Sequence, residues 1–485
     1  MAWNTATGLG SRVIGLVGTL ILVRFISPEE YGQVSTAMIC VMTAAYLTNL
    51  QFGQYIIVKG YREHGVAFHA AVYHICLGWA AVAVAFLGRD LLGPWLGAPT
   101  MGRFMGGFVL ASAMESIAIV PEKTLARDLR FRQIALTRGI GELLYTVLAL
   151  SFVSSLGGFA LVLGAVGRSA LIMTVFLAAS DRQWLRPVRM SWPTSLAMFR
   201  YSSPLALANM TDFATMRWDN LLIGKFHGAG VMGAYNLSYN LSQTSTLSIA
   251  ENIADVLFPS FARLEPRHRG QALVRAVSAM ALVVFPLAFG LAAVAANVVG
   301  AFFPPQWALI APMLTVLSVH SAAQPPSWTF RAFYKAQDRT TFVMIAGIVR
   351  LTVLLTGIVA IGRFGPLWAC VAVDIAFVTH FVLMWSGLRR DHAGLMWPTA
   401  RGVIQALLAC VPMVASVLVL QGIERHLFPL PPVWALCLEI PAGVVGYLIG
   451  AALFARETST DLLGLLMRLL KPGRDQSGQP SAVST

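Results

Sequence analysis

A cluster of charged and amide side chains interrupts an apolar stretch near the middle of the chain. The stretch Asn209 to Asn240 contains Asp212, Arg217, Asp219 and Asn220. At 100° per residue of an α-helix, these side chains share one face. The segment GKFHGAG (224–230) follows, and its glycines predict a short turn before a second apolar segment begins at Val231. We therefore expect a helical hairpin with one polar face.

Arginines recur inside or at the ends of apolar segments, at Arg12, Arg24, Arg138, Arg168, Arg217 and Arg350. Insertion scales put an arginine near the bilayer centre at about 2.5 to 3.5 kcal/mol, so we expect these side chains to face protein or a water-filled cavity. A guanidinium group bonds phosphate oxygens bidentately, which favours a phosphate-bearing substrate. Together with Asn220, the arginines are the predicted substrate-binding residues. Snorkelling to the membrane surface is the alternative for Arg24, Arg138 and Arg350.

A second set of candidates consists of carboxylates in apolar surroundings: Asp212, Asp219, Glu251, Asp255 and Asp374. Such groups can neutralise the arginines or can bind a coupling ion such as H⁺ or Na⁺. Glu251 and Asp255 lie one helical turn apart and share a face. Both roles stay open, and Arg217 is the residue that we expect to meet the charged group of the substrate.

Composition assigns these residues to a membrane protein. Of 485 residues, 57% are hydrophobic and 12% are charged, and the mean hydropathy is +0.69. The net charge of +13 comes without any nucleic-acid-binding module, so we expect no nucleic-acid partner. The five cysteines and the intramembrane histidines stand singly, without metal-ligand spacing or a nucleophile motif. We expect no cofactor, no metal and no catalytic site, and the N-terminus predicts no signal peptide.

Hydropathy predicts fourteen membrane-spanning helices, since a span needs about 20 apolar residues. They are spans 1 to 14, at 5–25, 34–57, 67–87, 103–121, 134–153, 159–179, 203–224, 231–256, 276–302, 307–326, 341–361, 365–387, 401–421 and 432–454. A short amphipathic helix at 460–470 and a disordered tail should follow.

Positive charge alternates between the connections. Connections after even-numbered spans are rich in Lys and Arg, such as Lys123 to Arg132, whereas those after odd-numbered spans hold few, such as Lys225 and Arg363. Lys and Arg are retained in cytoplasmic loops, so both termini should be cytoplasmic. The longest connection, around Asp181 to Arg200, is too short for a soluble catalytic domain.

An internal repeat relates two halves of the chain. Arg24-Phe25 precedes Gly32 by the same spacing with which Lys225-Phe226 precedes Gly233, so the offset is 201 residues (225 minus 24). Two six-helix lobes related by pseudo-twofold symmetry follow from this repeat. We expect an N-terminal lobe at 1–180, a cytoplasmic linker at 181–200, a C-terminal lobe at 201–390, two further spans at 391–455, and the amphipathic helix and tail at 456–485.

Three motifs carry a family resemblance. LVRFISPEEYG (22–32), VPEKTLARDLRFRQIA (120–135) and RWDNLLIGKFHGAGVMGAYNLSYNL (217–241) resemble the polysaccharide-transport family. These are Wzx-like lipid-linked oligosaccharide flippases of the multidrug/oligosaccharidyl-lipid/polysaccharide exporter superfamily. The resemblance implies a bacterial inner-membrane protein that moves undecaprenyl-diphosphate-linked glycan repeat units between leaflets by alternating access. Exopolysaccharide, capsule and O-antigen of lipopolysaccharide are the candidate products.

The implied partners are the polyprenyl-diphosphate-linked glycan, membrane lipids, and a polysaccharide polymerase with its export machinery. Three other functions remain alternatives. One is a channel or structural membrane protein, against which the two-lobe repeat favours a moving transporter. A cation-coupled drug antiporter of the same superfamily would have twelve spans and an early carboxylate in its N-terminal lobe, whereas span 1 here offers Arg12 and Arg24. A membrane polysaccharide polymerase or ligase would require a large periplasmic loop. Neither expectation matches the sequence.

Overall fold

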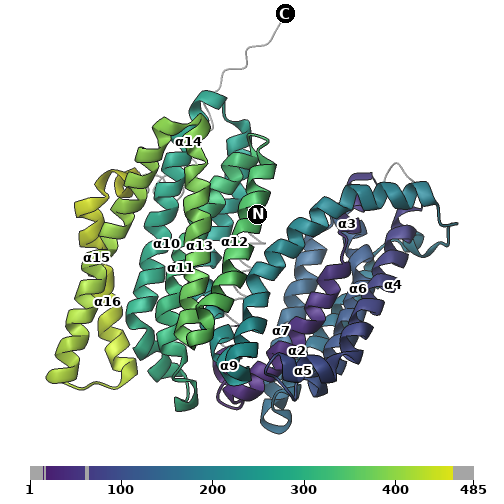
Figure 1. The fold of residues 1–485 in the computed structure, drawn as a ribbon, viewed down its shortest axis with the longest axis horizontal. Helices are drawn as coiled ribbons and strands as arrows, with labels where there is room; N and C mark the ends of the chain where they lie inside the picture. Colours follow the sequence, from purple (N-terminus) through teal and green to yellow (C-terminus); the bar gives the residue numbers. More distant parts are fainter. Residues whose placement is uncertain (1–14, 16–17, 60–64, 462–485) are drawn as a thin grey trace, which may run out of the picture. The chain divides into compact units, whose positions relative to one another are not determined.

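The computed structural model describes residues 15, 18–59 and 65–461 (Figure 1). Within these residues the chain is helical and contains no strand. The helices are α2 (Pro28–Thr48), α3 (Phe52–Lys59), α4 (Val66–Leu87), α5 (Arg89–Trp95), α6 (Gly102–Arg127), α7 (Phe131–Leu156), α8 (Phe159–Ala179), α9 (Trp192–Arg263), α10 (Pro266–Phe302), α11 (Ile310–Lys335), α12 (Thr340–Ala360), α13 (Pro366–Ser386), α14 (Leu388–Asp391), α15 (Met396–His426) and α16 (Pro432–Phe454).

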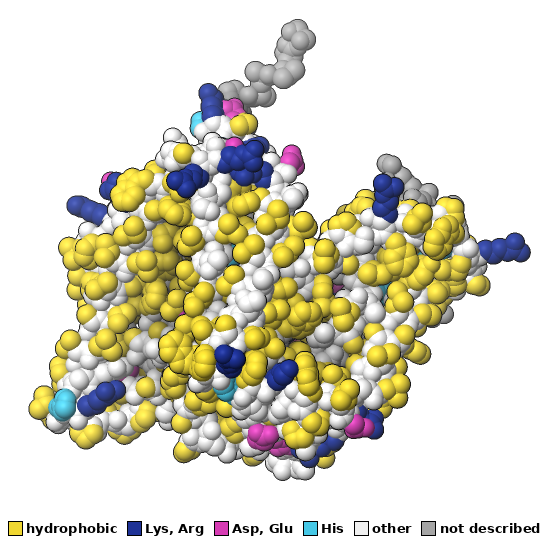
Figure 2. Space-filling model, in the orientation of Figure 1, with side chains coloured by type: hydrophobic (Ala, Val, Ile, Leu, Met, Phe, Trp, Pro, Cys, Tyr) yellow, Lys and Arg dark blue, Asp and Glu magenta, His cyan; other side chains and the backbone are white. Residues whose placement is uncertain are grey.

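The helices have the length and hydropathy of membrane spans. In the part of the chain that the structure describes, nine helices are long and apolar enough to cross a bilayer. Hydrophobic side chains cover much of the face in Figure 2, and Lys and Arg gather toward helix ends. The longer helices that miss the hydropathy threshold are α2, α9 and α11, which carry buried polar residues such as Thr36, Asp219 and His320. The chain is a multi-pass, all-helical membrane protein.

α9 is a hairpin rather than one rod. Gly228 has φ 83° and ψ 170°, a conformation that favours glycine and breaks the helix at this point. The side chains of Asp219 and Tyr235 are hydrogen-bonded although 16 residues separate them. In a straight helix these residues would be about 24 Å apart. The predicted hairpin is therefore confirmed, with its turn at Gly228.

Most predicted spans coincide with observed helices, but several boundaries differ. α10 begins at Pro266 rather than at 276, and α11 ends at Lys335 rather than at 326. Span 2 was predicted at 34–57, but α2 begins at Pro28 and ends at Thr48, and α3 follows after a break in which Gln51 has φ 57°. Ser27 caps the start of α2 by accepting a hydrogen bond from the Glu30 N–H group. α9 begins at Trp192, ahead of the predicted residue 203. Span 1 and the amphipathic helix at 460–470 lie largely outside the described residues.

Residue contacts divide the chain into two compact units. The first consists of residues 1–244, 295–320 and 340–380, and the second of residues 245–294, 321–339 and 381–485. Side chains such as Phe104, Met105 and Val162 form the core of the first unit. Phe285 and Met413 belong to a core of the second unit, in which α15 and α16 pack against each other (Figure 1). The lobe boundaries expected from the repeat stay a prediction.

The connections after spans 1, 3, 5, 7, 9 and 11 meet at one end of the first unit. We call them the connection cluster (residues 23–32, 93–101, 157–158, 224–231, 303–307 and 361–362). Trp307 Nε1 donates a hydrogen bond to the Val23 carbonyl oxygen (3.0 Å). The Gly158 N–H group donates to Glu30 Oε1 (2.8 Å). His227 Nε2 lies 2.8 Å from the Gly362 carbonyl oxygen. These bonds join the connections at 23–32, 157–158 and 303–307 to one another, and the connection at 224–231 to the one at 361–362.

The remaining connection, after span 3, approaches the turn of α9. A Cβ atom added to Gly97 would lie 2.2 Å from the Gly224 carbonyl oxygen. The Thr100 N–H group also donates a hydrogen bond to Gln33 Oε1 (3.2 Å) on α2. All six connections are therefore tied together.

The two copies of the repeated motif contact each other reciprocally within this cluster. A Cβ atom added to Gly32 would lie 1.8 Å from the Ala229 carbonyl oxygen. A Cβ atom added to Gly233 would lie 2.3 Å from the Pro28 carbonyl oxygen. Gly32 and Gly233 are equivalent at the offset of 201 residues, and so are Pro28 and Ala229. A twofold axis between the copies produces such a contact, and only glycine allows the approach.

Candidate functional site

Asp219 is the most enclosed of the charged side chains that the structure describes in the α9 hairpin. Its side chain has no exposed surface. One carboxylate oxygen accepts a hydrogen bond from the Tyr235 hydroxyl (2.5 Å), and the other accepts from the backbone N–H and the side-chain amide of Asn220 (2.8 Å each). The Asn220 oxygen in turn accepts from Asn236 Nδ2 (2.9 Å). Asp219 and Asn220 therefore join the two halves of the hairpin.

The same network continues toward α2. Asn236 Oδ1 accepts hydrogen bonds from Asn240 Nδ2 (2.9 Å) and from the Tyr31 hydroxyl (3.4 Å). The Tyr31 ring also meets the edge of the Trp307 ring, with 5.9 Å between the centroids. Polar side chains of the hairpin are thus connected to the connection cluster.

Arg350 forms an ion pair with Asp212. Arg350 Nη2 lies 3.1 Å from Asp212 Oδ1, and the two residues are 138 positions apart in sequence. Arg350 is 3% exposed, whereas the Asp212 side chain is about half exposed. The Arg350 guanidinium also lies over the Phe377 ring, 5.4 Å from its centroid. Asp212 and Asp219 thus have different partners, although the helical wheel placed them on one face.

Two further predicted arginines are also neutralised by carboxylates. Arg138 Nη2 lies 2.6 Å from Glu122 Oε2, and the Arg138 side chain is 55% exposed. Arg168 on α8 lies 3.0 Å from Glu142 on α7 and 3.8 Å from Glu115 on α6. Neither guanidinium group is available as an unpaired cation.

Arg217 differs from these arginines. It is half-buried on the first half of α9, and no carboxylate lies within ion-pair distance of it among the residues that the structure describes. Its charge acts electrostatically on Asp219 and on the phenol groups of Tyr31 and Tyr239. Arg217 therefore supplies positive charge beside the polar network.

Of the remaining predicted residues, Arg24 and Asp374 are described and the others lie outside the description. Arg24 is exposed in the connection after span 1. Asp374 on α13 accepts a hydrogen bond from the His320 backbone N–H group (3.1 Å) and is mostly buried. Arg12 lies outside the described residues, and so do the side chains of Glu251 and Asp255 in α9.

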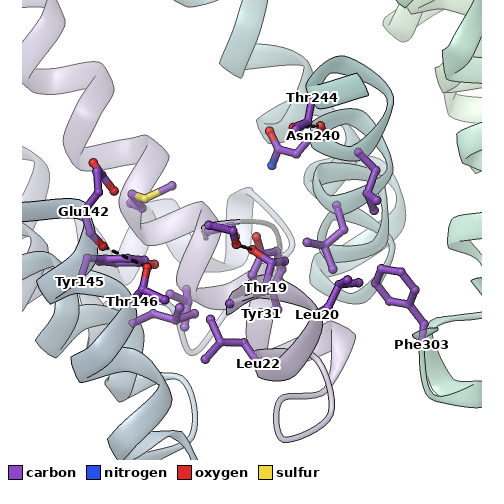
Figure 3. A pocket seen from close by; sticks show the side chains of 18 of the residues that line it. Thr19, Leu20, Leu22, Tyr31, Glu142, Tyr145, Thr146, Asn240, Thr244 and Phe303 are labelled. Carbon is purple, nitrogen blue, oxygen red and sulfur yellow. Dashed lines mark hydrogen bonds between the residues drawn. The ribbon is translucent and has the colours of Figure 1, made fainter. Parts of the chain in front are cut away.

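A cavity of about 330 Å³ adjoins the network within the first unit (Figure 3). Glu142, Tyr145 and Thr146 of α7 line one side, and Asn240 and Thr244 of the second half of α9 lie across from them. The first span contributes Gly18 and Thr19, and α2 contributes Tyr31 and Ser35. Ligand-binding pockets commonly measure about 300 to 1,000 Å³, so the cavity can hold part of a ligand.

Sequence reasoning missed part of this lining. Tyr31 was interpreted only as part of a turn motif, and Tyr145 was not singled out. The sequence does contain a signal for Tyr145, because Glu142, Tyr145 and Thr146 have the i, i+3, i+4 spacing of one helix face. No local signal identifies Tyr31, because its partner Asn236 lies in the other copy of the repeat.

Solved structures with the same fold define the class of protein. The lipid II flippase MurJ in an inward closed conformation matches with a TM-score of 0.74 at 13% identity, covering 94% of this chain and 99% of that chain. An inward-facing multidrug resistance MATE family transporter matches with a TM-score of 0.66 at 16% identity, covering 79% and 95%. The chain therefore has the fold of these membrane transporters.

A family model described as "Polysaccharide biosynthesis protein" matches residues 21–312. Because the match covers more than half of the chain, this protein belongs to that family, and the family resemblance of the three motifs is confirmed. Among the relatives, the succinoglycan biosynthesis transport protein ExoT of Rhizobium meliloti is 24% identical over 98% of this chain and 95% of its own length.

Proposed function

We propose that this protein is a flippase for polyprenyl-diphosphate-linked oligosaccharide repeat units in the bacterial inner membrane. Its product lipid would serve the synthesis of exopolysaccharide, capsule or O-antigen, and a polymerase with its export machinery would act next. The similarity to ExoT, a succinoglycan biosynthesis transport protein, supports a polysaccharide cargo. The shared fold with MurJ, a lipid II flippase, supports a lipid-linked one.

The observation that carries the proposal is the environment of Arg217. A half-buried guanidinium group with no carboxylate partner among the described residues is costly in an apolar setting unless it meets an anion. A diphosphate group is such an anion, and its oxygens fit the planar donors of arginine. Arg138, Arg168 and Arg350 are already paired, so they contribute less to phosphate binding than the sequence suggested.

The connection cluster supports alternating access. Its connections are the ones with few Lys and Arg residues, so the positive-inside rule assigns this end to the periplasm and both termini to the cytoplasm. With the cluster joined, substrate would enter from the cytoplasmic side. Parting of the cluster would then release substrate to the periplasmic side as the lobes at 1–180 and 201–390 move.

Reconstitution into liposomes tests the proposal. A fluorescent polyprenyl-diphosphate oligosaccharide in both leaflets is exposed to a membrane-impermeant quencher, with and without the protein. We expect the protein to raise the quenchable fraction from about half toward completeness. An unchanged fraction across several glycans, with correctly inserted protein, would contradict the proposal.

A cation-coupled antiporter is the second candidate, and the buried carboxylates favour it. Asp219 is fully buried, Asp374 is nearly so, and the MATE transporter shares the fold. The same liposomes distinguish the candidates when Na⁺ or H⁺ gradients are imposed. Gradient-driven accumulation of a cationic drug without transfer of the glycolipid would favour the antiporter, whereas a polymerase or ligase would alter the glycan itself.

A further inference from the structure

The cavity of the first unit is lined by hydrogen-bonding groups rather than by cations. Among its described lining residues there is no Lys or Arg, and Glu142 is the one carboxylate. Arg168 does not itself line the cavity, but its Nη1 atom lies 3.0 Å from Glu142 Oε1. Because Arg168 and Glu142 neutralise each other, the described lining offers a diphosphate group no unpaired cation. A diphosphate group therefore fits this cavity poorly.

The hydrogen-bonding groups are mainly acceptors. The hydroxyl groups of Thr19 and Thr146 donate to backbone carbonyl groups one turn earlier, at Gly15 and Glu142. The Tyr31 hydroxyl donates to Asn236. Oxygens whose protons are committed in this way keep their acceptor lone pairs. Such a lining suits a ligand that carries many hydrogen-bond donors, whereas an ionised phosphate offers acceptors only.

Sugar hydroxyl groups are donors of this kind. A sugar ring also has apolar C–H faces, and the cavity presents Tyr145 and Phe303 beside its polar groups (Figure 3). Tyr145 is itself held under the Arg168 guanidinium, 5.6 Å from the ring centroid. Glu142 and Tyr145 are therefore both positioned by Arg168.

Position relates this cavity to Arg217. Tyr31 lines the cavity, and its hydroxyl is hydrogen-bonded to Asn236, which bonds Asn220, three residues after Arg217 on α9. A phosphate near Arg217 and a sugar in the cavity are therefore neighbouring groups. We infer that the cavity is the subsite for a sugar residue of the lipid-linked glycan, with Glu142 and Tyr145 bonding its hydroxyl groups and Arg168 as the positioning residue. This inference rests on the proposed function.

Calorimetric titration of the full-length protein in detergent tests the inference. The probes are a short-chain polyprenyl diphosphate and the same lipid carrying one glucose, galactose or N-acetylglucosamine. We expect the wild type to bind at least one glycosylated probe about tenfold or more tighter than the bare lipid. Glu142→Gln should weaken that binding about tenfold, and Tyr145→Phe about 2- to 10-fold, as expected for one hydrogen bond each. Binding of the bare lipid should not change.

Matched variants separate the possible failures. Glu122→Gln changes another arginine-paired glutamate that does not line this cavity, and it should leave the sugar preference unaltered. Tyr145→Phe removes a single hydroxyl, so it serves if Glu142→Gln fails to fold. Equal binding of bare and glycosylated lipids by the wild type, or equal losses for both in the two variants, would overturn the sugar subsite. Failure to bind any of these lipids would instead contradict the proposed function.

Discussion

Replacing Gly32 by alanine should part the connection cluster. The added Cβ would lie 1.8 Å from the Ala229 carbonyl oxygen, whereas ordinary contact begins at 3.4 Å, so the backbones must separate by about 1.6 Å. The obstacle is backbone, and no side-chain rotation relieves it. Overpacking of this kind costs about 1 to 3 kcal/mol. If the cost falls on the joined state alone, its population relative to the parted state drops about 5- to 150-fold.

Hydrogen–deuterium exchange in nanodiscs measures this shift. We expect Gly32→Ala to speed exchange in peptides covering residues 23–36 and 224–236, with Gly233→Ala acting in the same direction because its Cβ would lie 2.3 Å from the Pro28 carbonyl oxygen. Gly347→Ala is the control, since nothing lies within 4 Å of a Cβ at that site. Wild-type exchange in both cluster variants would refute the reciprocal contact as the element that holds this end together.

Two other predictions concern stability. Tyr235→Phe removes a hydrogen bond to the buried Asp219 and should lower the free energy of unfolding by about 1 to 3 kcal/mol. The loss is measured as a lower melting temperature in detergent. An unchanged melting temperature would mean that Asp219 does not depend on this bond. Asp212→Asn leaves the Arg350 guanidinium buried without its charge partner, whereas Arg350→Met removes the buried charge itself. Asp212→Asn should therefore lower the melting temperature more than Arg350→Met does. A larger loss for Arg350→Met would argue against a buried Arg350.

The sequence predicted the helices well where apolar runs are bounded by charge or glycine. The turn at Gly228 was evident from its glycines, whereas the break near Gln51 was not, because apolar residues continue on both sides of it. The offset of 201 residues identified the two motif copies. Gly32 contacts the second copy of the motif and Gly233 contacts the first. These are tertiary contacts, which the hydropathy pattern cannot predict.

The candidate site was harder to predict for the same reason. An intramembrane arginine is recognisable in sequence, but its partner is not. Arg168 pairs with Glu142 from a neighbouring helix, and Arg350 pairs with Asp212 from a helix 138 residues away. Only the three-dimensional structure separates these paired arginines from Arg217, and it adds a cavity lined by hydrogen-bonding groups, which a search for cations could not find.

The most direct test of the account is the transfer rate of a fluorescent polyprenyl-diphosphate oligosaccharide in liposomes containing Arg217→Ala. Arg425→Ala, which removes an exposed arginine, is the matched control. Losing the charged donor to the diphosphate should slow transfer about tenfold or more, while Arg425→Ala stays near the wild-type rate. Transfer by Arg217→Ala at the wild-type rate, with equal amounts of inserted protein, would contradict the role of Arg217 in recognising the substrate.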